Sequence, residues 1–380
     1  MKKILFVLPS LEVGGTMSSF ISLFHFLKDK YDIDVFAISH DGLSDIPFKS
    51  NLLPRNNLIH AYRCIFSKSK GLNRLYVLIV KILKKLLVLF SISDCFIYKP
   101  TLKRLSNKYD IVIGFQEGIS TKFVSEIVAK KKIAWVHCDY SRHLNSGTEL
   151  GVYCRFTNVV CVSKYTADIF SSIYPSLRER VKYVYNLLSY DQIVAKGIEK
   201  IDDSRFKNEK FTIISVGRLD PVKRFEYIPK IASKLKANGL DFTWYVIGPN
   251  IGNECVLDLQ NNIENYNVDD YVYYLGGKEN PYPYFKNSNL LVSLSQSEAC
   301  PMIFNEAKIL GLPVVSTDFP SSYEFIKNGL NGKICSIDDI SDVLSYVISQ
   351  ESYYQSLLKN VAKEVYSNTK ILEELDDLFL

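Results

Sequence analysis

Residues 298–306 have the sequence Glu-Ala-Cys-Pro-Met-Ile-Phe-Asn-Glu, in which two carboxylates enclose a proline that can start a helix. Pro301 suits the first helical position, because its missing N–H would have no helical partner there. The amides of the next three residues, Met302, Ile303 and Phe304, would then point out of the helix start and could bind an anion. Glu298 lies before the helix and Glu306 one turn inside it. The pattern predicts a site for a ligand with both phosphate and hydroxyl groups.

The flanking residues place this motif at the carboxyl end of a strand. Residues 290–295 form an apolar run before it, Gly311 stops the helix, and residues 312–318 form the next apolar run. Open α/β sheets bind ligands beside the carboxyl ends of their strands. A simpler alternative stays open, a buried helix start with two ordinary surface acids, because glutamate is common in first turns.

The motif resembles the signature of glycosyltransferase family 4, Glu-x7-Glu followed by a Gly-Leu-Pro-Val-Val strand, which is found here at residues 311–315. The resemblance extends over nearly the whole chain and includes bacterial capsule and lipopolysaccharide glycosyltransferases. It implies the α/β architecture called GT-B, with two facing Rossmann-like domains built on parallel sheets. It also implies a C-terminal helix that crosses back to the first domain.

Length and repetition predict the same division. The 380 residues exceed one typical core. Residues 3–38 and 211–248 both follow the order strand, loop, helix, strand, which is typical of parallel sheets with crossover connections. In the second stretch the predicted strands are 212–216 and 242–247, and the predicted helix lies near 224–237. We predict an acceptor-binding domain over 1–189, a charged and aperiodic linker over 190–208, a nucleotide-sugar domain over 209–368, and the crossover helix over 369–380.

Composition narrows the class of protein. Hydrophobic residues make up 47% of the chain, but no run of about 20 uncharged apolar residues occurs. The apolar run at the N-terminus ends at Pro9, so it is predicted as a first strand and not as a signal peptide. The eight cysteines are scattered without a Cys-x-x-Cys pair, which favours neither a disulfide framework nor a zinc site. We therefore expect a cytoplasmic protein.

Arg218 and Lys223 follow another predicted strand, which ends at Gly217. Two cations at a strand's carboxyl end suit a diphosphate leaving group whose negative charge grows as its bond breaks. The family keeps an Arg and a Lys five residues apart, usually with glycine after the lysine, where this chain has Arg224. A solvated basic turn is the alternative.

Four further residues gain a role from the resemblance. His137 ends an apolar run and matches the histidine that contacts the donor sugar, although a lone histidine after a strand is more often structural. Gly14 and Gly15 match the loop that approaches the donor phosphate or the acceptor, where glycine allows close backbone approach. They do not form Gly-x-Gly-x-x-Gly, so a nicotinamide or flavin site is not indicated. Gly276 lies in a segment that resembles the loop beside the nucleotide base.

The resemblance implies a retaining reaction by front-face attack, in which the leaving phosphate accepts the acceptor's proton. Arg218, Lys223 and the helix start would stabilise the departing diphosphate, while Glu298 and His137 would orient the sugar. The expected cosubstrate is a nucleotide sugar, with uracil the commonest base in the family, and no other cofactor or metal is needed. The string Asp32-Ile33-Asp34 matches the Asp-x-Asp of metal-dependent transferases, but it opens a predicted strand, where polar residues are ordinary.

Positive charge is concentrated in residues 61–108, which hold eleven Lys or Arg and one acid, whereas the whole chain has a net charge of +5. Within this segment, residues 75–90 combine thirteen apolar residues with three lysines. This composition favours an interfacial helix on an anionic membrane, with a core helix as the alternative. Nucleic acid is a poorer fit, because the apolar content exceeds what a phosphate-tracking helix needs.

The sequence therefore predicts a metal-independent hexosyltransferase, peripheral on the inner face of the cell membrane, that acts on a lipid-linked or glycan acceptor. Two other hypotheses stay open. One is a GT-B epimerase of UDP-sugars, which would not need the basic segment. The other is a catalytically silent membrane-binding protein of the same fold, against which the full set Arg218, Lys223, Glu298 and Glu306 argues.

Overall fold

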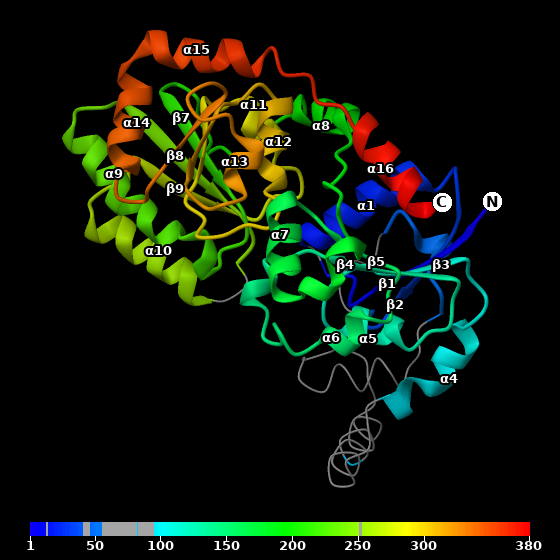
Figure 1. The fold of residues 1–380 in the computed structure, drawn as a ribbon. Coiled ribbons are helices and arrows are strands. Elements are labelled where there is room, and N and C mark those ends of the chain that lie inside the picture. The colour runs from blue at the N-terminus through cyan, green and yellow to red at the C-terminus, as the bar shows by residue number, and fades with distance from the viewer. Residues whose placement is uncertain (13, 41–45, 55–81, 83–94, 251–252) are drawn as a thin grey trace. The chain divides into compact units, whose positions relative to one another are not determined.

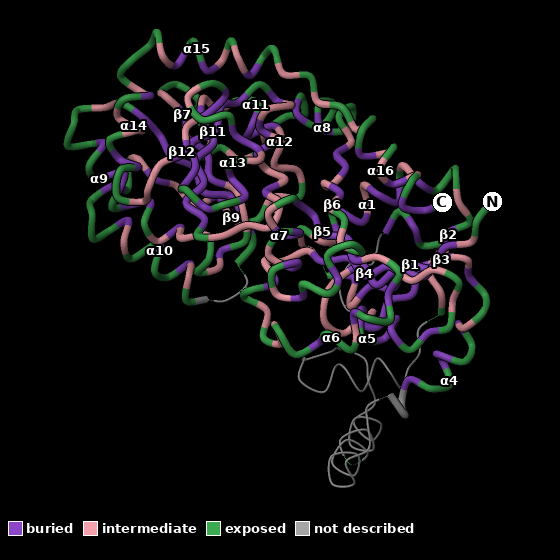
Figure 2. Tube along the Cα trace, in the orientation of Figure 1, coloured by how far each residue is buried: buried purple, intermediate pink, exposed green. Residues whose placement is uncertain are grey.

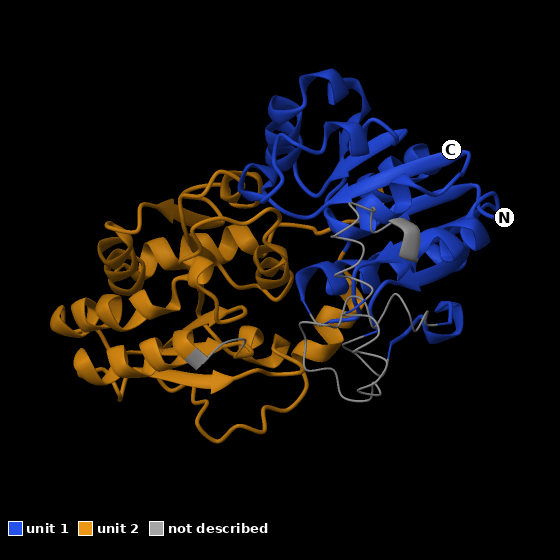
Figure 3. Ribbon diagram, turned by 90° about the horizontal axis from the view of Figure 1, so that it is seen from below, with its two compact units in different colours: residues 1–187, 370–380 blue, residues 188–369 orange. Residues whose placement is uncertain are grey.

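A computed structural model of the chain describes residues 1–12, 14–40, 46–54, 82, 95–250 and 253–380. These residues form two compact units (Figure 3). Unit 1 comprises Met1–Leu187 and Lys370–Leu380, and unit 2 comprises Leu188–Thr369. Within the described ranges, every helix is too short or too polar to traverse a bilayer.

Unit 1 contains a sheet of six parallel strands in the order β2-β1-β3-β4-β5-β6 (Figure 1). The strands are β1 (Lys3–Leu8), β2 (Asp32–Ala37), β3 (Ile111–Gly114), β4 (Lys131–Val136), β5 (Asn158–Cys161) and β6 (Val181–Tyr183). Most of their residues are buried, as Figure 2 shows, which is the pattern of a parallel sheet covered on both faces. In the register of the sheet, Leu5 of β1 lies between Asp34 of β2 and Val112 of β3.

The helices of unit 1 contribute buried residues to its core. They are α1 (Gly15–Leu27), α4 (Cys95–Leu105), α5 (Ile119–Ser125), α6 (Leu150–Tyr153), α7 (Lys164–Ile173) and α16 (Thr369–Phe379). In α1, Phe20 stacks edge-on against Phe6 of β1 and against Phe115, with ring centroids 5.2 and 5.3 Å apart. The helix α7 begins with a capping box, in which Ser163 and Thr166 satisfy each other's backbone amides.

The C-terminal helix packs on unit 1, as predicted. The Lys2 ammonium donates hydrogen bonds of 2.8 and 2.7 Å to the carbonyls of Phe379 and Leu380. Asp376 of α16 pairs with Lys30 at 2.9 Å. The chain therefore returns to its first domain, and this part of the GT-B prediction is confirmed.

Unit 2 repeats the plan with six parallel strands in the order β12-β11-β10-β7-β8-β9. The strands are β7 (Phe211–Val216), β8 (Phe242–Ile247), β9 (Val272–Gly276), β10 (Leu290–Ser293), β11 (Val314–Thr317) and β12 (Gly332–Cys335). The helices are α8 (Tyr190–Gly197), α9 (Ile228–Ala237), α10 (Asn253–Asn265), α11 (Tyr282–Lys286), α12 (Met302–Ile309), α13 (Ser322–Phe325), α14 (Ile340–Ser349) and α15 (Glu351–Val361). Short 3₁₀ turns lie at Lys49–Asn51, Tyr140–Arg142, Pro175–Arg180, Pro221–Lys223 and Phe225–Tyr227.

Two predicted elements differ from the structure. Residues 190–208 are not a plain linker, because α8 forms there and belongs to unit 2. The contact is close: a Cβ on Gly197 would lie 2.7 Å from the Leu310 side chain. The helix predicted near residues 224–237 begins only at Ile228, because Arg224 adopts a left-handed conformation with φ 54° that interrupts it.

Candidate functional site

The predicted donor residues of unit 2 lie where its strand order changes direction. β7 is hydrogen-bonded to β8 on one side and to β10 on the other. The chain leaves β7 and β10 at the same edge of the sheet, because all the strands run parallel. The loops 217–223 and 294–301 therefore meet at the position where open α/β sheets bind ligands.

An ion pair joins these two loops. The Lys223 ammonium contacts the Oε1 atom of Glu298, and both side chains are mostly buried. Ser295 donates a hydrogen bond of 2.8 Å to the same oxygen. The Ser321 hydroxyl fixes the backbone by donating to the Glu298 carbonyl at 2.6 Å. No described residue donates to Glu298 Oε2, so this oxygen is available to a ligand hydroxyl.

Glycines let the first loop pass close to its neighbours. A Cβ on Gly217 would lie 3.3 Å from the Lys223 side chain, so glycine makes room for the ammonium stem. A Cβ on Gly248 would lie only 1.6 Å from the Gly217 carbonyl oxygen, which is backbone and cannot turn away. Leu219 anchors the loop by donating its amide to the Pro249 carbonyl at 3.2 Å. Gly248 was not predicted from the sequence, although it comes directly after the predicted strand 242–247.

Arg218 lies on the exposed side of this loop. Its guanidinium is 3.7 Å from the Asp220 carboxylate and does not contact the Lys223–Glu298 pair. Arg224, which stands where the family usually has glycine, has a positive φ of 54°. Glycine adopts this left-handed conformation without penalty, so the backbone geometry explains the family's usual residue.

The start of α12 differs in detail from the prediction. Pro301 is the N-cap residue and not the first helical residue. The Phe304 amide is not free, because it donates to the Pro301 carbonyl at 3.0 Å. Among the described residues, no backbone carbonyl accepts from the amides of Met302 and Ile303. Two of the three predicted donors are therefore open to an anion.

Glu306 lies one turn further along α12 and is partly buried. Its Oε1 atom accepts a hydrogen bond of 3.2 Å from the Tyr282 hydroxyl. Burial raises the pKa of Glu306 to about 7, and the tyrosine hydrogen bond acts in the opposite direction. The carboxylate is therefore poised between its two forms near neutral pH, a common property of functional sites.

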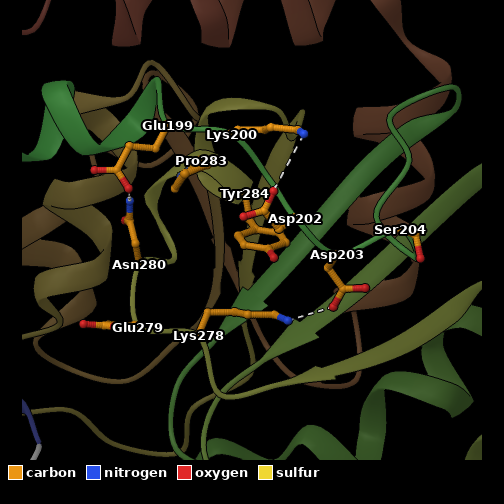
Figure 4. Close-up of a pocket in the computed structure, with 10 residues that line it drawn as sticks. All are labelled: Glu199, Lys200, Asp202, Asp203, Ser204, Lys278, Glu279, Asn280, Pro283 and Tyr284. Atoms are coloured by element: carbon orange, nitrogen blue, oxygen red, sulfur yellow. Dashed lines mark hydrogen bonds and ion pairs between the residues drawn. The ribbon is translucent and has the colours of Figure 1, made fainter.

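Strand β9 ends at Gly276, whose φ of 76° favours glycine. The loop that follows borders a cavity of about 450 Å³ between residues 199–204 and 278–284 (Figure 4). Lys278, which belongs to the segment predicted beside the nucleotide base, is already paired with Asp203 at 2.7 Å. Arg205 binds the same carboxylate at 2.6 Å, and together with Lys278 it holds the pKa of Asp203 far below its usual range. These contacts give the cation a structural role.

His137 lies in unit 1, directly after β4. Its Nε2 atom is buried and has no partner among the described residues, while its ring packs on Phe115 at 4.6 Å. Burial lowers the pKa of His137 to about 3, so the imidazole is neutral at physiological pH. The Glu117 carboxylate accepts the His137 backbone amide at 2.8 Å. Sequence analysis missed Glu117, whose signal was its place three residues after strand β3.

The packing of the described residues does not require glycine at positions 14 and 15, at the start of α1. An added Cβ on Gly14 or Gly15 would meet no described atom within 4 Å. This open space admits a ligand, and their role stays a prediction. Asp32 and Asp34, in contrast, both lie within 4 Å of the Lys3 ammonium, and Asp34 also accepts a hydrogen bond from Tyr109.

Two other predictions concern a metal ion and the basic segment 61–108. In the described part of the chain, no group of three or more His, Cys, Asp or Glu residues is arranged to hold a metal ion. The amphipathic segment 75–90 lies outside the described residues, apart from Ile82. The last part of the basic segment forms α4, on which Lys99, Lys103 and Arg104 are exposed while Leu102 and Leu105 are buried.

A known family model matches most of unit 2. Residues 198–364 match the family model described as Glycosyl transferases group 1. This segment is therefore similar to the group 1 glycosyl transferases. It lies within unit 2 and contains Arg218, Lys223, Glu298 and Glu306. The predicted resemblance to glycosyltransferase family 4 is confirmed.

Curated relatives match about half of the chain. An uncharacterized 41.2 kDa protein in the cps region of Klebsiella pneumoniae is 29% identical over 194 residues, which cover 50% of this chain and 51% of that protein. An uncharacterized glycosyltransferase of Methanocaldococcus jannaschii is 28% identical over 198 residues, which cover 51% of this chain and 46% of that protein. The chain thus spans about half the length of these curated relatives.

Solved structures show the fold over the whole chain. HepE from Anabaena, in complex with UDP and glucose, matches with a TM-score of 0.77 at 15% identity and covers 100% of this chain and 99% of its own. A variant of S. aureus TarM, in complex with fondaparinux, alpha-GlcNAc-glycerol and UDP, has a TM-score of 0.72 at 15% identity and covers 100% of both chains. The predicted GT-B fold is confirmed.

Proposed function

We propose that this protein is a retaining glycosyltransferase that moves a hexose-type sugar from a UDP-sugar to a membrane-associated glycolipid or polysaccharide precursor. The observation that carries the proposal is the Lys223–Glu298 pair at the switch point of the unit 2 sheet, beside the open amides of α12. A cation, a carboxylate and free amides are the groups needed to hold a sugar diphosphate. The UDP bound in solved structures of the same fold supports the choice of donor.

The chemistry follows from these groups. The bond between the sugar C1 atom and the diphosphate oxygen breaks, and the acceptor oxygen bonds to C1 on the same face. The acceptor's proton passes to the departing phosphate oxygen. Lys223, Arg218 and the amides of Met302 and Ile303 would stabilise the charge on the leaving group. Because the chain supplies this positive charge, the scheme does not require a metal ion.

The remaining residues orient the donor. Glu298 would accept a sugar hydroxyl through its available Oε2 atom, and Glu306 would accept the ribose hydroxyls. His137 would hydrogen-bond the sugar as a neutral imidazole, since its pKa of about 3 leaves it uncharged. Gly14 and Gly15 would let the backbone of unit 1 approach the ligand.

A thermal-shift screen against UDP-, GDP- and ADP-sugars tests the donor. A ligand that binds only the folded protein stabilises it by about 2.7 kcal/mol at a concentration 100 times its Kd. We expect UDP-sugars to raise the melting temperature more than GDP- or ADP-sugars do. If no nucleotide sugar changes the melting temperature, the donor assignment is wrong. Product analysis separates transfer from epimerisation, because an epimerase converts the UDP-sugar without an acceptor.

We also infer that unit 1 docks on an anionic membrane surface. The inference is supported by the charge of residues 61–108 and by the exposed Lys99 and Lys103 on α4. Each basic residue near such a surface contributes about 1 kcal/mol of binding. Replacing both lysines with glutamate is expected to lower partitioning onto anionic vesicles about tenfold or more in a sedimentation assay.

The matched control carries Lys359→Glu and Lys363→Glu, two exposed lysines with the same spacing at the end of α15. This control should partition like the wild type. Equal partitioning of the wild type onto anionic and neutral vesicles would rule out the electrostatic docking.

A further inference from the structure

Tyr282 is the described residue that hydrogen-bonds the Glu306 side chain. It is the first residue of α11, and its hydroxyl donates to Glu306 Oε1 at 3.2 Å. The hydrogen bond engages one carboxylate oxygen, and no described residue donates to Oε2. The phenol therefore fixes how the carboxylate is turned and leaves its second oxygen for a ligand.

The backbone of Tyr282 is held from the other side by Asn280. The Asn280 side-chain oxygen accepts the Tyr282 amide at 3.1 Å, and its nitrogen donates to the Lys196 carbonyl at 2.9 Å. The same nitrogen also donates to the Glu199 carboxylate at 2.7 Å, an interaction drawn as a dashed line in Figure 4. Asn280 thus fastens the start of α11 to the end of α8.

α8 in turn packs closely on the helix that carries Glu306. A Cβ on its Gly197 would lie 2.7 Å from the side chain of Leu310, the residue after α12, so a larger residue there would displace that side chain. The helix α8 therefore contacts both α11, which begins with Tyr282, and α12, which carries Glu306. The two side chains lie on helices that share this support.

We propose that Tyr282 is a positioning residue, which holds the Glu306 carboxylate in one orientation for the ribose diol of the nucleotide donor. The inference rests on the proposed function, which assigns the ribose to Glu306. Phenol and diol would then bind different oxygens of one carboxylate. The orientation of the carboxylate matters because a displaced Glu306 oxygen would lose its hydrogen bonds to both ribose hydroxyls.

The contact also predicts a dependence on pH. The ionised carboxylate accepts hydrogen bonds from both hydroxyls of the diol, so donor affinity should rise as the pH passes through about 7, the pKa of Glu306. The Tyr282 hydrogen bond lowers this pKa, so removing the phenol hydroxyl moves the rise to higher pH. Tyr366 is another ionisable group near Glu306, since burial and then the charges of Cys300 and Glu306 raise the pKa of Tyr366. On α8, the residue that approaches the end of α12 is the uncharged Gly197.

The test measures UDP binding by calorimetry from pH 6 to 9 in the full chain and in Tyr282→Phe. A hydrogen bond to a charged group contributes enough binding energy that Kd at pH 7 should rise about tenfold. The kcat at saturating donor should stay within about twofold, because the diol does not react. The matched control is Tyr284→Phe, the same change two residues further along α11, which should leave Kd unchanged.

Glu306→Gln completes a double-mutant cycle. With the carboxylate gone, adding Tyr282→Phe should cost little further affinity and should not move the pH profile. Additive losses, or an unchanged Kd and midpoint in Tyr282→Phe, would overturn the inference while leaving the proposed function intact. If the wild type binds no UDP at any pH, the proposed function fails and the inference fails with it.

Discussion

Replacing both Arg218 and Lys223 with alanine is expected to lower turnover about 10⁴-fold, because each removes a charge that stabilises the departing diphosphate and one such donor accounts for 10²–10³. The effect should appear in kcat measured at saturating donor, since the leaving-group charge develops in the transition state. Lys230→Ala, an exposed cation on α9, is the matched control and should leave turnover unchanged. Turnover within tenfold of the wild type would remove both residues from the mechanism.

The single variants Arg218→Ala and Lys223→Ala separate an effect of charge on turnover from an effect on folding stability. Arg218 is exposed, and among the described residues its ion-pair partner is Asp220 at 3.7 Å, so Arg218→Ala should slow turnover without lowering the melting temperature. Lys223→Ala leaves the mostly buried Glu298 carboxylate without its counter-ion, so it should lower both. A fall in turnover for Arg218→Ala at an unchanged melting temperature therefore isolates the electrostatic contribution.

The strands of the sheets could be predicted from sequence, because buried parallel strands are short apolar runs with turn residues at their ends. Residues 242–247 were predicted with the bounds that the structure gives, and residues 212–216 lack only Phe211. The meeting of Lys223 with Glu298 follows from the same information. Both residues come shortly after strands, and parallel strands have their carboxyl ends at one edge.

Contacts that depend on tertiary packing could not be predicted. The helix α8 has only two turns, and its pairing with α12 depends on a close approach at Gly197 that no local pattern reveals. The left-handed conformation of Arg224 could not be predicted either, because arginine rarely adopts a positive φ. The Phe304 amide donates to the Pro301 carbonyl. This hydrogen bond depends on the backbone conformation of Pro301 before the helix.

Gly248 supports the loop that carries Arg218 and Lys223. This residue follows β8, and its amide donates to the Gly276 carbonyl at 3.0 Å. The Gly217 amide donates to the neighbouring Ile247 carbonyl at 2.9 Å. The backbones at the ends of β7, β8 and β9 therefore pack directly against one another. The position of Lys223 depends on this close packing.

Gly248→Ala is therefore expected to damage both stability and catalysis. The new methyl group would lie 1.6 Å from the Gly217 oxygen and 2.7 Å from its carbonyl carbon, so the loop that carries Arg218 and Lys223 must shift. Overpacking of this kind costs about 3 kcal/mol or more when the obstacle is backbone. For a unit of this size the melting temperature should fall by about 6–12 °C. A shift of 1 Å in catalytic groups lowers turnover about 100-fold.

The matched control is Gly151→Ala in unit 1, where an added Cβ meets no described atom within 4 Å, and it should leave melting temperature and turnover unchanged. UDP binding gives a third readout, because displacement of the loop should raise the Kd of Gly248→Ala while its unit 1 remains folded. If Gly248→Ala melts and turns over like the wild type, the loops after β7 and β8 are not in backbone contact. The placement of Lys223 at the switch point would then need another support.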